Sequence, residues 1–433
     1  MSTASMNESG LGLHARTVPL EYGPDALQFD GSPTVLFDRP GLTLVGWGTA
    51  VMLEAAGATE ALATIPCEDS VQRPGSGVVA LGALPFVTPM SGQLIVPRFT
   101  MGIDRDADGE THRWATAVGP ADQPLPDTDE LFDAVLWQYG ATVPSPEVAV
   151  TGLTTTLSAD GYRELVERAV KTMRLPGAEL GKVVLSRSVT VTLSGPLPLA
   201  VVLRRMRAHE PNCTIFSVPV PDATFFGASP ELLMAKGGDR IWCHPLAGTV
   251  ARGDTARSDA DAQGWLAHST KEREEHRYVT DDIAARLGPL CRDLNVPAEP
   301  SLVAFRSVAH LGTRIEGHLK ESTPVLALIE LVHPTPAVGG APRELALATM
   351  AEGEPVPRGY WAGPVGWTDA EGDGEWMIGL RSASLHSDGE TVTLHAGAGV
   401  VADSDPASEA AETDVKLATV LESLVPGGSA HLR

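Results

Sequence analysis

WMIGLRSASLHSDGETVTLHAGAGVV, residues 376–401, decides the fold class of this chain. Two β-type runs flank the Ser-Asp-Gly sequence at 387–389, and an Asp-Gly turn between such runs is typical of a β-hairpin. The stretch that follows, SEAAETDVKLATVLESL (408–424), has helical periodicity, with Ser408 at a position typical of an N-cap. The segment therefore predicts a strand, a tight turn, a second strand and then a helix.

The rest of the chain repeats this mixture of hairpins and helices. KVVLSRSVTVTL (182–193) alternates like a strand, and TIFSVPV and ATFFGAS within 214–229 predict a hairpin around Pro221-Asp222. Helical patterns cover 198–210 and one long stretch at 258–288. The sequence has neither a regular βαβ alternation nor a G-x-G-x-x-G motif that opens a helix. It therefore predicts an α+β fold built on antiparallel sheets.

Composition excludes several classes of protein. The 433 residues carry 32 Lys plus Arg against 55 Asp plus Glu, and the net charge of −23 argues against binding to nucleic acid or to an anionic membrane. The four cysteines include no C-x-x-C pair, and no signal-like or 18-residue apolar run is present, so we expect a cytoplasmic protein. No oligomer signal is evident, and we expect a monomer.

The chain divides into four expected regions. Residues 1–30 look like an N-terminal arm, and 31–150 are expected to complete the catalytic fold rather than to form a domain of their own. Residues 151–425 carry the candidate functional motifs, and 426–433 form a C-terminal tail.

Two acidic helix faces are candidate metal ligands. Glu272 and Glu275 lie three residues apart, as do Glu409 and Glu412, so each pair shares one helix face. Two such faces can hold a hard divalent cation such as Mg²⁺ through oxygen. Solvated faces with ion pairs such as Glu412–Lys416 are the alternative, and spacing alone favours this alternative.

Three further features can carry chemistry. Lys182 opens an alternating strand and is one of only six lysines, although a solvated strand end is the commoner reading. Glu231, in FFGASPELL (225–233), lies between apolar segments, where a carboxyl group tends to stay protonated and can act as a general acid. The small-residue turns in 244–253 and 395–401 can offer backbone N–H groups to a carboxylate, or they can simply need glycine for a tight turn.

Nine motifs in one order resemble the chorismate-utilising enzymes. This family includes the isochorismate, salicylate, anthranilate and aminodeoxychorismate synthases. The motifs are GKVVLSR (181–187), FFGASPELL (225–233), PLAGT (245–249), KEREEH (271–276), VHPTPAVGG (332–340), GYWAGPVGW (359–367), GEWMIGLRSA (374–383), HAGAGVV (395–401) and ETDVKLATVL (412–421). The resemblance implies two large antiparallel β-sheets packed together and flanked by helices, with a Mg²⁺-dependent site that binds chorismate.

The resemblance also implies roles for residues at matching positions. Lys182 is expected to activate water, and Glu231 is expected to protonate the departing 4-hydroxyl group. The expected metal ligands are Glu275 and Glu412, supported by Glu272 and Glu409. The expected substrate-binding or site-lining residues are Gly248, Thr249, His333, Arg381, Gly397, Ala398, Gly399 and Lys416.

Within this family, the residues of the motifs resemble those of the isochorismate synthases most closely. The amine-inserting members resemble one another in lacking the lysine found here at 182, because their nucleophile is ammonia, so no glutaminase subunit is expected. Salicylate synthase, which adds pyruvate elimination, is the alternative enzyme, and an inactive homologue that binds chorismate is the alternative of another class. Pro364 departs from the apolar residue expected there and leaves the local strand geometry open. The sequence does not distinguish a role in menaquinone synthesis from one in siderophore synthesis.

Overall fold

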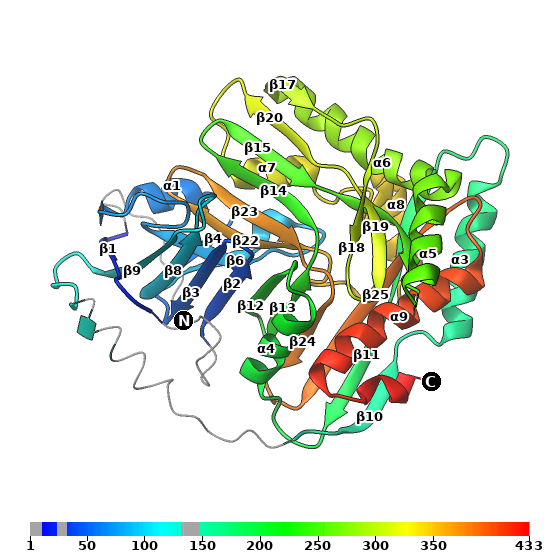
Figure 1. Ribbon diagram of the computed structural model, residues 1–433, viewed down its shortest axis with the longest axis horizontal. Coiled ribbons are helices and arrows are strands. Elements are labelled where there is room, and N and C mark those ends of the chain that lie inside the picture. Colours follow the sequence, from blue (N-terminus) through cyan, green and yellow to red (C-terminus); the bar gives the residue numbers. More distant parts are fainter. Residues whose placement is uncertain are drawn as a thin grey trace.

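Three β-sheets and the helices around them make up the fold in Figure 1. The computed structural model describes residues 11–23, 33–127, 129–130, 133, 147–253 and 255–432. Almost all strand pairs in it are antiparallel, and the pair of β1 with β5 is parallel. The predicted α+β class with two large sheets is confirmed, and a small third sheet is added to it.

The largest sheet has 13 strands and contains both halves of the chain. Strands from residues 35–120 follow directly on strands from residues 150–401 within it. Its order is β10-β11-β25-β24-β13-β12-β2-β3-β8-β9-β1-β5, with β21 also paired to β11. The bounds are β1 (Leu13–Pro19), β2 (Val35–Arg39), β3 (Leu42–Trp47), β5 (Cys67–Asp69), β8 (Phe99–Arg105), β9 (Thr111–Pro120), β10 (Val150–Thr155), β11 (Lys182–Leu193), β12 (Thr214–Val220), β13 (Ala223–Ser229), β21 (Gly340–Ala341), β24 (Ser382–His386) and β25 (Thr391–Val401).

The other two sheets have nine and three strands. The nine-stranded order is β17-β20-β15-β14-β23-β22-β6-β7-β4, and the three-stranded order is β16-β19-β18. Their bounds are β4 (Val51–Glu54), β6 (Val79–Ala83), β7 (Gln93–Val96), β14 (Leu232–Gly237), β15 (Arg240–His244), β16 (Leu246–Ala251), β17 (Cys291–Asn295), β18 (Ser301–Ala304), β19 (Val308–Gly312), β20 (Ile315–Leu319), β22 (Pro364–Asp369) and β23 (Gly374–Ile378).

Helices cover the sheets from outside. In Figure 1, α9 runs along β25 and β11 with α3 beside it, and α5 and α6 lie next to the three-stranded sheet. The bounds are α1 (Ala58–Ala63), α3 (Ala159–Met173), α4 (Leu199–His209), α5 (Ala256–His268), α6 (Thr270–Leu287), α7 (Val325–Val332), α8 (Arg343–Gly353) and α9 (Pro406–Leu424), with 3₁₀ turns η1 (Pro89–Ser91), η2 (Gly288–Leu290) and η3 (Gly428–Leu432). Among the described residues, no helix is both long and apolar enough to cross a membrane.

The core lies between the two large sheets and under the helices. Successive residues of a strand point to opposite faces, and both faces of the central strands are covered. In β2, Phe37 packs with Trp367 of the nine-stranded sheet, whereas Leu36 packs into the cluster that α4 and α9 cover with Leu203 and Leu417. Burial on both sides explains why these strands read as continuous apolar runs rather than as alternating ones.

The segment 376–401 departs from the simple hairpin predicted for it. Its first run is split: β23 ends at Ile378 in the nine-stranded sheet, and β24 begins at Ser382 in the 13-stranded sheet. The predicted turn at Asp388-Gly389 is confirmed, with β24 and β25 paired across it. A similar crossing joins β13 to β14 at Pro230 and Glu231, and the chain also passes between the two large sheets from β3 to β4 and from β7 to β8.

Several local expectations are corrected. Residues 13–19, assigned to a loose N-terminal arm, form β1 between β9 and β5, while 1–10 and 24–30 lie outside the described residues. The long helix at 258–288 is two helices, because Ser269 adopts an extended conformation and caps α6. The last helix starts earlier than predicted, with Asp405 rather than Ser408 as its N-cap. Pro364 is accommodated as the first residue of β22, a strand position that proline tolerates.

Candidate active site

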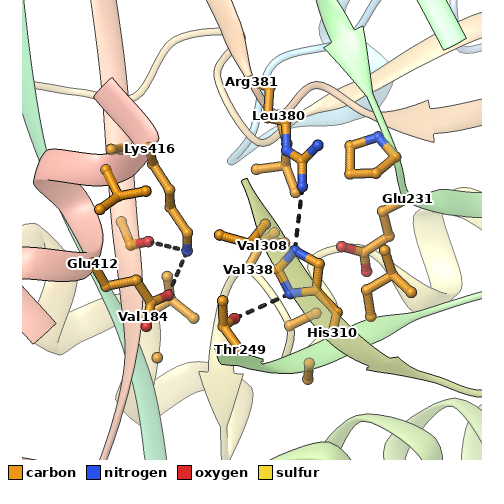
Figure 2. Close-up of a pocket in the computed structure, with 18 of the residues that line it drawn as sticks. Val184, Glu231, Thr249, Val308, His310, Val338, Leu380, Arg381, Glu412 and Lys416 are labelled. Atoms are coloured by element: carbon orange, nitrogen blue, oxygen red, sulfur yellow. Dashed lines mark hydrogen bonds and ion pairs between the residues drawn. The ribbon is translucent and has the colours of Figure 1, made fainter. Parts of the chain in front are cut away.

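A pocket opens beside the points where the chain crosses between sheets. Its empty volume is about 940 Å³, including the part that is open to solvent. Glu231 comes from the β13–β14 crossing and Arg381 from the β23–β24 crossing, Thr249 and His310 come from the three-stranded sheet, and Lys416 comes from α9. Figure 2 shows Lys416 and Glu412 on one side of the pocket and Glu231 on the other. Residues far apart in the sequence therefore converge on one space.

Glu231 is buried and held in its neutral form. Its side chain lies in the pocket wall, and its Oε1 has no hydrogen-bond partner among the described residues. Burial raises the pKa of Glu231 to about 8, although a backbone hydrogen bond from Leu246 and the charges of Lys182 and Lys416 pull it down. A carboxyl group in this state can donate a proton at neutral pH. The sequence prediction of a protonated acid at this position agrees with this geometry.

Arg381 is fixed by contacts on several sides. Its backbone φ of 48° lies in the left-handed region, which residues other than glycine rarely adopt. Its guanidinium lies 4.4 Å from the centre of the Phe305 ring, and its Nη1 is 3.6 Å from Oε2 of the buried Glu210. Its Nη2 donates to Nε2 of His310 at 3.3 Å. The guanidinium also lines the pocket, where it can bind a carboxylate.

His310 was missed by the sequence reading. Because its Nε2 accepts from Arg381, its proton lies on Nδ1, which donates to Oγ1 of Thr249 at 3.1 Å. Burial, together with the charges of Arg381 and Lys416, lowers the pKa of His310 well below its ordinary value. The ring is therefore neutral and links Arg381 to Thr249 (Figure 2). The only sequence signal was a single polar side chain inside the apolar strand β19.

Lys416 lies between its own helix and the 13-stranded sheet. Its Nζ is 2.7 Å from Oε1 of Glu412, one turn away on α9, and it donates to the carbonyl oxygen of Gly397 at 2.8 Å. All three residues line the pocket. The ion pair that spacing alone favoured thus exists, but it faces a pocket rather than bulk solvent.

Lys182 is fully buried behind the pocket wall. Its Nζ lies 3.0 Å from Oε1 of Glu275, which lines the pocket, whereas Lys182 itself does not. Gly399 makes this pairing possible, because a Cβ at that position would overlap the carboxylate of Glu275 and lie 3.2 Å from Cε of Lys182. The alternative reading of Lys182 as a solvated strand end is therefore excluded.

The four candidate metal ligands divide into two pairs. Glu275 and Glu412 line the pocket, whereas Glu272 and Glu409 do not. Burial raises the pKa of Glu272 to about 7, with a further contribution from the charge of Glu275, and burial followed by the charge of Glu412 also raises the pKa of Glu409. Lys271 lies between Glu272 and Glu409, with its Nζ 3.5 Å from Glu272 and 3.0 Å from Glu409.

This donor set fits Mg²⁺. Within the described part of the chain, no group of three or more His, Cys, Asp or Glu side chains could hold a metal ion by itself. A Mg²⁺ site on two carboxylates does not need such a group, because Mg²⁺ keeps several waters and commonly takes further ligands from an anionic substrate. Glu275 and Glu412 are the residues that would hold the ion.

Two of the expected site residues, His333 and Ala398, do not line the pocket. His333 does not line the pocket, because its buried ring donates through Nε2 to the carbonyl oxygen of Phe86 at 3.0 Å. Ala398 is buried in β25 and is not among the lining residues, unlike Gly397 and Gly399. Thr249 lines the pocket as expected, and its backbone N–H donates to Glu272 at 2.9 Å.

Gly248 lines the pocket as expected. Its φ of +78° is a backbone conformation that favours glycine, and a Cβ there would lie 3.1 Å from both Cβ and the carbonyl oxygen of Glu272. The turn at 248–249 therefore serves first to position Glu272.

Comparison with known proteins identifies relatives over most of the chain. Residues 43–425 match the family model described as chorismate binding enzyme. A Mycobacterium tuberculosis protein that carries the name MenF is 37% identical over 360 residues, which cover 81% of this chain and 88% of the relative. The isochorismate synthase DhbC of Bacillus subtilis is 34% identical over 355 residues, which cover 80% of each chain.

A solved structure agrees with the fold. The menaquinone-specific isochorismate synthase MenF from Escherichia coli superposes with a TM-score of 0.81 at 26% identity, covering 96% of this chain and 95% of that chain. The predicted resemblance is thus supported by both the sequence and the structure comparisons.

Proposed function

This chain belongs to the chorismate-binding enzyme family, and from that membership we propose that it is an isochorismate synthase that uses Mg²⁺. The reaction adds water at ring carbon 2 of chorismate and removes the hydroxyl group from carbon 4. Relatives named as isochorismate synthases support this choice. The observation that carries it is Glu231, a buried acid whose pKa of about 8 keeps it protonated in a pocket that also presents two cations, Arg381 and Lys416.

The two cations bind and orient the substrate. Chorismate is a dicarboxylate, and Arg381 can grip one carboxylate through two parallel N–H groups while Lys416 offers a point charge. His310 and Phe305 hold the guanidinium in place before the substrate arrives. Orientation of this kind lowers the barrier, because less freedom remains to be lost in the transition state.

Protons move at two separate residues. As the oxygen of water bonds to carbon 2, Lys182, in its neutral form and turned from Glu275 toward the pocket, takes the proton that the water releases. As the carbon 4–oxygen bond breaks, Glu231 gives its proton to the departing oxygen, which leaves as water. One proton is taken up and one is released, so the net reaction is an isomerisation. Separate groups for the acid and the base allow each to hold the protonation state it needs.

The metal would be held by Glu275 and Glu412 and would act as a Lewis acid toward substrate oxygen. The proposed enzyme is a cytoplasmic monomer that works without a glutaminase subunit. All four cysteines lie in the described residues and are free of disulfides, which supports the cytoplasm. The names of the solved relatives include a menaquinone-specific and a 2,3-dihydroxybenzoate-specific isochorismate synthase, and we propose no choice between a role in menaquinone synthesis and one in siderophore synthesis.

Incubation of the purified protein with chorismate and Mg²⁺ tests the proposal. Isochorismate is the expected product by chromatography, and addition of EDTA is expected to stop its formation. Salicylate and pyruvate as the main products would instead identify a salicylate synthase. Binding of chorismate without any product would identify an inactive homologue. In the Glu231→Gln variant, loss of turnover with retained chorismate binding is expected.

A further inference from the structure

Glu210 is a buried acidic residue beside the pocket that the proposed reaction does not use. It is the C-cap residue of α4, and it is only 6% exposed. It does not line the pocket, but its Oε2 lies 3.6 Å from Nη1 of Arg381, which does. A buried carboxylate keeps its charge when a cation lies this close. A negative charge thus lies directly behind the guanidinium that is proposed to bind the substrate.

Glu210 acts on Arg381 through charge rather than through a hydrogen bond. The 3.6 Å separation is too long for an N–H···O bond, and Oε1 of Glu210 has no hydrogen-bond partner among the described residues. Other groups orient the guanidinium, because Nη2 donates to His310 at 3.3 Å and the Phe305 ring centre lies 4.4 Å away. Removal of the charge of Glu210 would leave both of these contacts in place.

The other groups beside Arg381 do not supply this charge. Sγ of Cys213 lies 3.9 Å from Nη1 of Arg381, but burial raises the pKa of this thiol to about 12, so it stays neutral. Glu412 also offsets a pocket cation, Lys416, but it lines the pocket and is assigned to the metal. Glu210 lies outside the pocket, so it stays beside Arg381 when a ligand binds.

A charge in this position opposes the binding of an anion to Arg381. The carboxylate of a ligand on the pocket side of the guanidinium has the same sign as Glu210, and buried charges are screened only weakly by solvent and salt. Chorismate and isochorismate carry the same two carboxylates. The repulsion therefore weakens the binding of substrate and product alike, and it favours release of the product.

We propose that Glu210 is an affinity-tuning residue, whose buried negative charge weakens the hold of Arg381 on the carboxylate of the substrate and of the product. The inference rests on the proposed function and deepens it. Two other roles make different predictions. A residue that positions Arg381 would strengthen substrate binding, and a purely structural residue would affect stability without changing substrate binding.

Steady-state kinetics of the Glu210→Gln variant with chorismate and Mg²⁺ separates these roles. KM is expected to fall about tenfold, the lower end of what one nearby charge does to the affinity for a proton. We expect kcat to change little, because the repulsion acts equally on the bound substrate and on the transition state. The constant for product inhibition by isochorismate should fall by the same factor as KM.

Two matched variants control for charge and for burial. Glu210→Asp keeps the negative charge behind Arg381, and its KM is expected to stay near that of the wild type. Glu375→Gln removes a buried carboxylate that pairs with Arg39 and does not line the pocket. Its KM is expected to equal that of the wild type, whatever the substitution costs in stability.

The remaining outcomes would overturn the inference. A higher KM in Glu210→Gln would show that Glu210 positions Arg381, and an unchanged KM in the folded variant would leave only a structural role. Either result would leave the proposed function intact, provided that the wild type forms isochorismate. If Glu210→Gln does not fold, as judged by its thermal melt, Glu210→Met also removes the charge and should lower KM in the same way. A wild type that neither binds nor converts chorismate would overturn both proposals.

Discussion

Replacing Glu231 with glutamine is expected to remove a specific pH dependence of stability. The carboxyl group of Glu231 is buried with one oxygen unpaired, and burial raises its pKa to about 8 from an ordinary value of 4.5. The folded protein therefore keeps a proton at pH 6 to 8 that the unfolded chain has already released. Because the folded state binds more protons, its stability falls as pH rises through this window.

The size of the effect follows from the two pKa values. They lie about 3.5 apart, and each step of one on the pH scale corresponds to 1.36 kcal/mol. The cost of holding the group in the folded state is almost absent below pH about 4.5 and complete above pH about 8. Between about pH 6 and pH 9, the wild type should lose about 2–3 kcal/mol of unfolding free energy through Glu231 alone.

Urea unfolding of both proteins at a series of pH values measures this loss. The experiments use EDTA and no chorismate, so that neither metal nor substrate changes the site. Glu272, whose pKa burial also raises, to about 7, is present in both proteins and cancels in the difference. The wild type should lose about 2–3 kcal/mol more than Glu231→Gln across this range. Parallel pH profiles for the two proteins would refute the assignment of Glu231 as a buried neutral acid.

Three other substitutions test the remaining assignments. Lys182→Met should lower kcat by about a thousandfold, as expected for loss of a general base, while the affinity for chorismate measured by calorimetry changes little. An equal loss of kcat and of chorismate affinity would argue for a structural role of Lys182. Gly399→Ala places a Cβ against Glu275, so the Mg²⁺ affinity measured by calorimetry should fall about tenfold, while the circular dichroism spectrum stays unchanged. An unchanged Mg²⁺ affinity would contradict the assignment of Glu275 as a ligand. Arg381→Lys keeps the charge but loses the paired donors, so KM for chorismate should rise about tenfold and more than kcat falls, and an unaltered KM would exclude a substrate contact.

Much of the fold was predictable, because strand and helix patterns are local. The hairpin at 214–229, the strand at 182–193 and the turn at Asp388-Gly389 all appear as the pattern indicates. Where the chain changes sheets, the prediction was wrong. Nothing local distinguishes Ile378 to Ser382 from the interior of a strand, because the departure depends on which sheet each half joins.

Site residues divide in the same way. Motif order selected Lys182, Glu231, Arg381 and Lys416, and the structure gathers three of them around one pocket with Lys182 directly behind its wall. His310 escaped notice, because its partner Arg381 lies 71 residues away in the sequence. His333 was wrongly predicted to line the site. Its buried ring donates to the carbonyl oxygen of Phe86, and no local pattern in the sequence indicates this long-range contact.

The sequence by itself determined the family, the antiparallel architecture and the kinds of chemical group at the site. These depend on residue identity, local periodicity and motif order, which can be read from a single sequence. Only the tertiary structure decided which carboxylates face the pocket and which are held by Lys271. Spacing places Glu272 and Glu275 on one helix face, but the neighbours packed against that face determine which of them meets the substrate.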